Sequence, residues 1–285
     1  MGEKKFFTIG EVSKMCNISA KALRYYDKIG VISPDYISEE NGYRYYSWET
    51  LLKVPVLKYY KQMDFKLEEM QELLSCSSYE IVRHSLHNKI DELKVHIQEL
   101  QDSLISVCDW YDLIQEAQLV VQNRIQDISV RYLRSSVHCY MDQKFEYDYK
   151  GSIINIPWTN YLEECNEKVT GPVILSFPSF EEKRKGTCKQ CRILQKAVCP
   201  NSNSAIQVRE GAMMAASVYH IGSHETIDQE YDRIQEWAKQ RGYLCGPMCF
   251  ERYVIDYWTT QDSNQFVTEI IVPLQVQNLP VRGKD

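Results

Sequence analysis

The sequence lacks an apolar run long enough to cross a membrane. None of its hydrophobic stretches approaches the roughly 20 residues that a spanning helix needs. Residues 1–5 lead into the first motif without the apolar core of a secretion signal, and Phe6 stands where a myristoylation signal requires Ser or Thr. These absences predict a cytoplasmic protein that does not use a membrane as a partner.

The sequence also lacks the basic excess of proteins that coat nucleic acid. Its 33 Lys and Arg are outnumbered by 39 Asp and Glu, for a formal net charge of −6. Residues 1–62 nevertheless hold ten basic and seven acidic side chains, a net charge of +3 that leaves −9 for the remainder. A weakly basic head on an acidic body can orient toward phosphate, but the charge alone does not predict DNA binding.

The ten cysteines come without the short chain and secretion signal of a disulfide framework. We therefore expect reduced thiols, most of them inert in the core. With 285 residues, 44% hydrophobic and 25% charged, the chain is long enough for more than one globular domain.

The first 30 residues contain the start signals of two short helices. Thr8 followed by Glu11 is a capping box, and Ser19 can cap a second helix in the same way. Residues 16–18 form a short turn between them. This order predicts a helix-turn-helix, whose second helix exposes Lys21, Arg24, Tyr25 and Lys28.

A small β-wing should follow the two helices. Asn41-Gly42 is a two-residue hairpin signal, because both positions tolerate positive φ. It places Tyr43, Arg44 and Tyr45 at the base of the wing. Core packing is the alternative for the tyrosines of this region, but the neighbouring arginines and the wing favour DNA contact.

Three blocks in this region carry a family resemblance: T-I-G-E-V, L-R-Y-Y-D-K-I-G and N-G-Y-R-Y-Y. In this order they resemble the winged-helix domain of the MerR family of transcription regulators. The resemblance implies binding to double-stranded promoter DNA, distortion of the promoter spacer, and action on RNA polymerase. It further implies that Thr8, Ser19 and Tyr25 contact phosphates, that Lys21 and Arg24 face base edges or phosphates, and that Tyr43 and Arg44 serve the wing.

Residues 47–63 should form the next helix. Pro55 removes a backbone hydrogen bond there, which predicts a kink or break near Val54. The family resemblance places a turn at Asp64, where the family usually has Gly, so Asp64 must accept a left-handed conformation.

A heptad pattern begins at Leu86. Its spacings alternate between four and three residues, as in a coiled coil. The repeat consists of Leu86, Ile90, Leu93, Ile97, Leu100, Leu104, Val107, Tyr111 and Ile114. An intramolecular hairpin is the alternative, but no second heptad segment is present to pair with it. We therefore expect a homodimer, and the family resemblance implies antiparallel helices.

Beyond residue 122 the pattern changes to strands alternating with short helices. Strands are expected at 128–133, 171–177, 212–221 and 246–253, and helices at 156–164 and 227–237. In each half, Gly-Pro follows a helix that bears Trp and Tyr. This recurrence predicts an internal duplication with a pocket between the halves.

The second half resembles the GyrI-like effector-binding domain, through Trp237 and residues 242–243, 251–253 and 266–274. Together with a MerR-like head, this implies a multidrug-sensing activator. The expected ligand-binding residues are Tyr149, Glu251, Tyr253, Tyr257 and Glu269. Two carboxylates among aromatic rings would suit a lipophilic cation. In the alternative interpretation each Glu is solvated or pairs with a structural Arg such as Arg252.

Cys188 and Cys191 have the spacing of a zinc-knuckle pair, and Cys199 follows. Basic neighbours would lower the pKa of these thiols, and Cys165, His220 or His224 could complete a zinc site. No second C-x-x-C pair is present. The alternative is an exposed loop of unspecialised thiols.

The sequence thus predicts an α+β protein of three parts. These are a winged helix-turn-helix at 1–75, a dimerisation coiled-coil helix at 76–121, and a duplicated α+β effector-binding domain with an antiparallel sheet at 122–285. The predicted function is a ligand-responsive regulator of the activator type that is not an enzyme and binds an inverted-repeat promoter as a homodimer. Two alternatives remain: a metal- or redox-responsive regulator acting through Cys188, Cys191 and Cys199, and a hydrolase. The second arises because some GyrI-like domains are hydrolases, although no Ser-His-Asp order is present.

Overall fold

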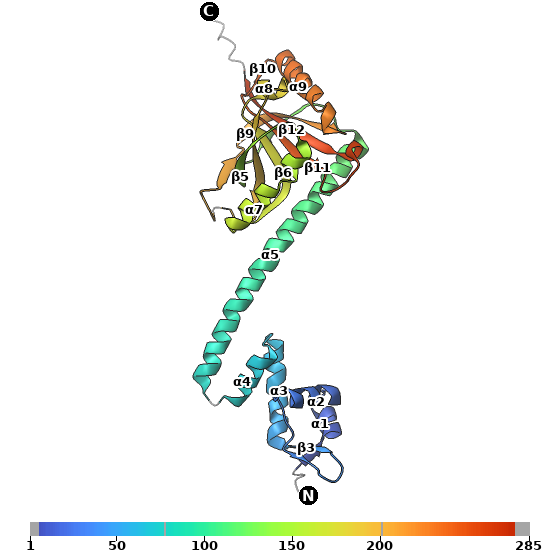
Figure 1. Ribbon diagram of the computed structural model, residues 1–285, viewed down its shortest axis with the longest axis vertical. Coiled ribbons are helices and arrows are strands. Elements are labelled where there is room, and N and C mark those ends of the chain that lie inside the picture. The colour runs from blue at the N-terminus through green and yellow to red at the C-terminus, as the bar shows by residue number, and fades with distance from the viewer. Residues whose placement is uncertain (1–5, 77, 201, 277–285) are drawn as a thin grey trace, which may run out of the picture. The chain divides into compact units, whose positions relative to one another are not determined.

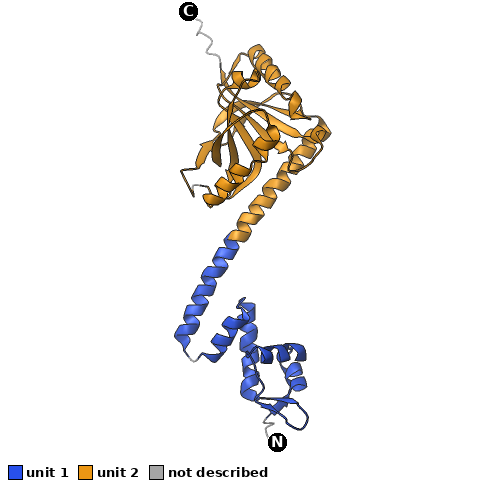
Figure 2. Cartoon of the chain, in the orientation of Figure 1, with its two compact units in different colours: residues 1–98 blue, residues 99–285 orange. Residues whose placement is uncertain are grey.

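The computed structural model describes residues 6–76, 78–200 and 202–276. The expectations for residues 1–5 lie outside this range. The chain forms two compact units, residues 1–98 and 99–285 (Figure 2), and one helix, α5 (Tyr79–Asn123), is common to both. The expected domain boundaries at 75 and 121 stay predictions.

The first unit is a small winged-helix domain (Figure 1). Its elements are β1 (Phe6–Thr8), α1 (Ile9–Met15), α2 (Ala20–Lys28), β2 (Tyr36–Ile37), β3 (Arg44–Ser47), α3 (Trp48–Gln62) and α4 (Leu67–Ser75). The three strands form an antiparallel sheet in the order β1-β3-β2. A core around Val12, Leu23, Tyr46 and Leu57 joins sheet and helices.

Both predicted helix caps are confirmed. The Thr8 backbone N–H donates to Glu11 Oε2 at 2.9 Å, and the Glu11 N–H donates to Thr8 Oγ1 at 3.4 Å. The Ala22 N–H donates to Ser19 Oγ at 3.1 Å. Asn17 takes φ 47° in the turn, which sets α2 across α1 as a helix-turn-helix requires.

Two local predictions were wrong. The wing is not a two-residue hairpin: six residues, 38–43, connect the paired strands, and Gly42 has φ 69° while Asn41 is not in the left-handed region. α3 also continues through Pro55 as one helix with Val54 buried, so the expected break is absent, while the expected kink stays a prediction. Packing of α3 against the core outweighs the one lost backbone hydrogen bond. Asp64 takes φ 60°, as expected.

Helix α5 is 45 residues long, about 68 Å at 1.5 Å per residue, and carries the heptad pattern from Leu86 to Ile114. The middle of the repeat is exposed in the single chain: Ile90, Ile97, Leu100, Leu104, Val107 and Tyr111. Toward its C-terminal end the helix turns a different face, formed by Leu113, Ala117 and Val120, onto the second unit, where these residues pack against Val254 and Val267.

The second unit is built on one curled antiparallel sheet in the order β4-β9-β12-β11-β6-β7-β5-β8, with β10 also paired to β12. The strands are β4 (Ser129–Leu133), β5 (Ser136–Lys144), β6 (Val169–Phe177), β7 (Gln190–Ala197), β8 (Gln207–Glu210), β9 (Met213–Ile221), β10 (Tyr243–Cys245), β11 (Cys249–Ile255) and β12 (Val267–Val276). The helices are α6 (Tyr149–Ile153), α7 (Ile156–Glu164), α8 (Phe180–Arg184) and α9 (Asp228–Gln240), with 3-10 turns at His224–Thr226 and Ser263–Gln265.

The sheet order supports the predicted duplication. Strands β5-β7-β6 mirror β9-β12-β11, and β6 pairs with β11 where the halves meet. Gly171-Pro172 lies at a register shift within β6, and Gly246-Pro247 lies between β10 and β11. Each Gly-Pro therefore interrupts pairing at a corresponding place in its half, since proline offers no N–H to the ladder.

The two faces of this sheet differ. Side chains of α7 and α9, such as Trp158 and Ile234, pack on the face that bears Leu175 and Tyr253. The C-terminal part of α5 covers a portion of the other face.

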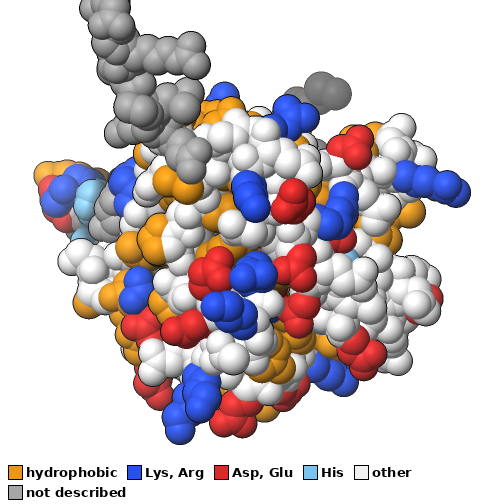
Figure 3. Space-filling model, turned by 90° about the horizontal axis from the view of Figure 1, so that it is seen from above, with side chains coloured by type: hydrophobic (Ala, Val, Ile, Leu, Met, Phe, Trp, Pro, Cys, Tyr) orange, Lys and Arg blue, Asp and Glu red, His pale blue; other side chains and the backbone are white. Residues whose placement is uncertain are grey.

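On the surface drawn in Figure 3, basic and acidic side chains are interspersed, which agrees with the modest net charge. Among the described residues, no helix is both long and apolar enough to span a bilayer.

Candidate functional sites

Helix α2 presents the predicted DNA-contacting side chains to solvent. Lys21, Arg24 and Tyr25 are exposed, whereas Leu23 and Tyr26 face the core. Thr8 and Ser19 lie at the N-termini of α1 and α2, where their hydroxyls cap the helices. Backbone N–H groups at these two ends are suited to phosphate, because the helix dipole favours an anion there.

The wing places its two predicted residues differently. The Tyr43 side chain is exposed, but Arg44 Nε donates to Asp27 Oδ2 at 2.9 Å. This ion pair ties the wing to α2, so Arg44 has a structural partner that the sequence analysis did not foresee. Tyr36 and Ile37 were also missed: both are exposed on β2 beside the wing.

In the second unit, Glu251 lies at the centre of a buried polar cluster. Its side chain is 0% exposed. Tyr231 donates to Oε1 at 2.6 Å, Tyr253 donates to Oε2 at 2.5 Å, and Lys183 Nζ lies 3.0 Å from Oε1. Residues from both halves meet here, because Lys183 comes from α8 and the other three come from α9 and β11.

The Lys183 ammonium is enclosed by aromatic rings. Its Nζ donates to Tyr149 Oη at 2.8 Å and lies 4.8 Å from the ring centre of Tyr231 and 5.0 Å from that of Phe177. The rings of Phe145, Tyr147 and Tyr149 lie within 5.7 Å. Burial alone would lower the pKa of Lys183, but the Glu251 carboxylate and Tyr149 outweigh it and raise that pKa, so Lys183 is a cation.

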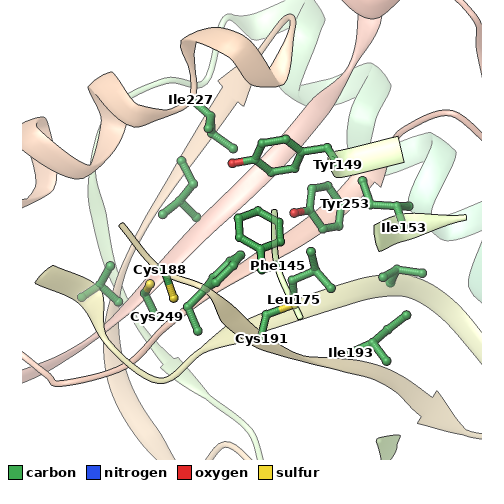
Figure 4. Close-up of a cluster of buried hydrophobic side chains, with 14 of the residues drawn as sticks. Phe145, Tyr149, Ile153, Leu175, Cys188, Cys191, Ile193, Ile227, Cys249 and Tyr253 are labelled. Carbon is green, nitrogen blue, oxygen red and sulfur yellow. The ribbon is translucent and has the colours of Figure 1, made fainter. Parts of the chain in front are cut away.

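Figure 4 shows Tyr149, Tyr253 and Phe145 gathered in this cluster, above Cys188, Cys191 and Cys249. Lys183 was not among the predicted site residues. The sequence offers only a weak signal for it: it follows the apolar Phe180 by three residues, which is helical spacing. The run of charges around it pointed instead to a solvated loop.

Glu269 does not join this cluster, so the expectation of two carboxylates in one pocket was wrong. In the β11–β12 register Glu269 pairs with Arg252, whose side chain points to the face opposite Glu251. Arg252 Nε lies 2.6 Å from Glu269 Oε2, and Arg131 and Ser217 contact Oε1. For Glu269 the alternative expectation, an ion pair with the structural Arg252, is confirmed.

Tyr149 and Tyr257 border an open cavity of about 430 Å³. Tyr149 stacks on His224 with ring centres 4.7 Å apart, and Tyr257 packs edge-on against Phe266 at 4.7 Å. Burial lowers the pKa of His224 to about 4, so its ring is neutral near pH 7. Asp148, Glu225 and Asp228 line the same cavity. Its aromatic side chains connect through Tyr149 to Lys183 and Glu251.

The cysteine predictions were wrong in two respects. Cys188 and Cys191 are buried, not in an exposed loop, and burial raises the pKa of both thiols, to about 12 for Cys191. In the described part of the chain, no three His, Cys, Asp or Glu side chains are grouped to hold a metal, so Cys165, His220, His224 and Cys199 do not complete a site with them. His220 instead lies 3.5 Å from Glu230.

Comparison with known proteins agrees with this architecture. Residues 8–46 match the family described as MerR family regulatory protein, and residues 167–275 match the GyrI-like small molecule binding domain. The multidrug-efflux transporter 2 regulator of Bacillus subtilis is 27% identical over 95% of this chain and 97% of its own length. The multidrug-efflux transporter 1 regulator of that organism is 43% identical over 25% of each chain.

Among solved structures, the EcmrR–DNA complex is 23% identical, with a TM-score of 0.45 over 95% of this chain and all of that chain. The two family matches cover the helix-turn-helix with its wing and most of the sheet that holds Glu251. The chain therefore belongs to the MerR family of regulatory proteins and carries a GyrI-like small molecule binding domain.

Proposed function

We propose that this protein is a ligand-responsive transcription regulator that binds an inverted-repeat promoter as a homodimer and distorts the spacer for RNA polymerase. Its effectors are lipophilic small molecules. The observation that carries the proposal is the pairing of an exposed, basic helix α2 with a buried aromatic and carboxylate site in a second unit. The relatives named as multidrug-efflux transporter regulators support the same function.

The DNA interface consists of Lys21, Arg24 and Tyr25 on α2, the wing with Tyr43 and Arg44, and the capped helix ends at Thr8 and Ser19. In this arrangement α2 enters the major groove and the wing follows the backbone.

Dimerisation through α5 explains its exposed apolar stripe. Single-chain helices rarely leave so many large apolar side chains in water, and a second copy would cover them. A two-fold dimer carries two α2 helices and therefore reads a two-fold operator.

The effector signal can reach α5 through β11. Glu251 and Arg252 are adjacent on this strand, and Arg252 contacts both Glu269 and Glu116 of α5. Tyr219 Oη donates to Glu116 at 2.8 Å. A ligand that shifts β11 at Glu251 would thus shift the contacts of α5, the helix shared by both units.

We place the protein in the cytoplasm and do not assign it an enzyme activity. Glu251 is fully buried and held by Lys183, Tyr231 and Tyr253, so bulk water does not reach it as a hydrolytic base would require. The raised pKa values of Cys188 and Cys191 also argue against a thiolate sensor.

The test is in vitro transcription from the promoter upstream of the protein's own gene, with RNA polymerase and a panel of lipophilic compounds. We expect at least one compound to change transcript levels, and K21A/R24A to abolish both DNA binding and the response. Equal affinity of the wild type for this promoter and for a shuffled duplex would contradict the proposal.

A further inference from the structure

The surroundings of Glu251 have the composition of a receptor for an organic cation. Five aromatic rings lie within 5.7 Å of one point, and a fully buried carboxylate faces it at 3.0 Å. Aromatic faces attract cations through their quadrupoles, and the attraction increases when water is excluded. An ammonium ion is the ligand class that this cage suits.

The cage is already filled by the ammonium of Lys183, which is 0% exposed. The charge of Glu251 is balanced by this lysine, and both carboxylate oxygens accept hydrogen bonds from tyrosines. Asp228 Oδ1 also lies 3.6 Å from Lys183 Nζ, so the ammonium faces two carboxylates. A second cation is excluded because the Lys183 side chain already occupies the space between the rings.

Lys183 is held in place by the short helix α8. Phe180 is buried, and its N–H donates to the Pro247 carbonyl at 2.6 Å. Arg184 binds Asp232 of α9 at 2.9 Å and Glu181 at 3.0 Å. These contacts oppose a movement of α8 that would withdraw Lys183 from the cage.

We propose that Lys183 is a specificity-determining residue of the effector site: its side chain is a tethered cation that occupies the cage and excludes cationic ligands from Glu251. The inference rests on the proposed small-molecule sensing. It concerns the aromatic cage at Glu251 and not the neighbouring cavity over Tyr149, His224 and Tyr257, which Asp148, Glu225 and Asp228 also line.

The experiment removes the Lys183 side chain by mutation and supplies a free ammonium ion in solution. K183A removes the atoms from Cγ to Nζ, which n-propylammonium replaces. We expect n-propylammonium to raise the melting temperature of K183A and to bind it at least tenfold more tightly than it binds wild type. The uncharged 1-propanol should do neither. K185A, which alters an exposed lysine on the same segment, should behave as wild type.

The double variant K183A/E251Q tests the counter-charge. It removes both members of a buried ion pair, which destabilises less than leaving one charge unpaired. We expect it to fold and to respond equally weakly to n-propylammonium and 1-propanol. If K183A does not fold alone, refolding with and without n-propylammonium gives the same readout.

Three results would overturn the inference: no rescue of K183A by n-propylammonium, equal rescue of K183A/E251Q, or equally tight binding of n-propylammonium by the wild type and K183A. None of these affects promoter binding or a transcriptional response to other compounds, which test the proposed function separately.

Discussion

Glu251 and Arg252 are consecutive residues whose side chains point to opposite faces of the sheet, as strand geometry requires. Each forms an ion pair on its own face, Glu251 with Lys183 and Arg252 with Glu269. At the scale of residues, each buried charge depends on the oppositely charged side chain beside it. A buried charge is tolerated because an opposite charge and hydrogen bonds replace the lost water.

Breaking the Arg252–Glu269 pair should destabilise the fold strongly. In E269Q the guanidiniums of Arg252 and Arg131 lose their buried carboxylate, which costs about 3–5 kcal/mol in the free energy of unfolding. Urea denaturation measures this difference. D142N is the matched control, because it breaks the exposed Arg192–Asp142 pair and should cost less than about 1 kcal/mol. Equal losses in both variants would contradict the argument.

His224 should contribute to acid sensitivity. Its pKa in the folded protein is lowered to about 4 from 6.5, so the unfolded chain binds more protons between these values. The neutral ring contributes about 3 kcal/mol to the free energy of unfolding. This contribution is fully present above about pH 6.5 and is lost as the pH falls toward 4.

The H224Q variant removes this titration. We expect its free energy of unfolding to fall less than that of wild type between about pH 7 and about pH 4.5. H96Q, at an exposed histidine of α5, should retain the wild-type pH dependence. Parallel pH profiles for wild type and H224Q would contradict the assignment.

At the scale of elements, α5 serves two purposes along its length. Its middle carries the exposed heptad stripe, and its C-terminal end packs onto the sheet through Leu113, Ala117 and Val120. The change of face within one continuous helix allows the same element to pair with a second chain and to bind the effector unit.

The predicted dimer interface contains one of two nearby exposed residues of α5 and excludes the other. Ile97 is on the heptad stripe and 55% exposed, whereas Val95 is off it and 57% exposed. I97E should weaken dimerisation by on the order of 100-fold, because each chain loses a buried isoleucine and gains a buried charge. V95E should remain dimeric. Analytical ultracentrifugation distinguishes them, and equal behaviour of the two variants would exclude this stripe as the interface.

Coupling between the sheet and α5 depends on Glu116. In E116Q the charge that binds Arg252 is removed, so we expect a smaller transcriptional response to effector with unchanged promoter affinity. D112N makes the same chemical change one turn earlier at an exposed position and should respond as wild type. A full response of E116Q would show that the signal takes another route.

At the scale of the whole molecule, DNA binding joins two copies of the chain to one duplex. Each bound phosphate displaces counterions, so affinity falls with salt in proportion to the number of phosphates that the protein neutralises. The net charge of −6 means that this attraction comes from local basic groups in the heads rather than from the overall field.

The K21A variant should therefore reduce the dependence of promoter affinity on salt. Because each of the two heads then neutralises one phosphate fewer, the slope of log K against log salt should decrease by about two. K239A, at an exposed lysine of α9, should leave the slope unchanged. A lower affinity for K21A at an unchanged slope would place Lys21 at a base edge instead.

The sequence by itself determined the elements that have clear local patterns, but it did not predict β5, β7, β8, α6 or α8. The caps at Thr8 and Ser19, the heptads of α5 and the strand alternation of the second half are local patterns, and local patterns depend on residues a few positions apart. The two family resemblances, confirmed by the matches at 8–46 and 167–275, followed from the same short motifs.

Only the tertiary structure decided the partners of buried charges. Lys183 and Glu251 are 68 residues apart, and Arg44 meets Asp27 across the wing. Pro55 stayed within α3 because the core holds the helix, and Glu269 faced away from Glu251 because the β11–β12 register pairs it with Arg252. Charge pairing acts over a few ångströms in space, and these distances are set by how distant segments pack.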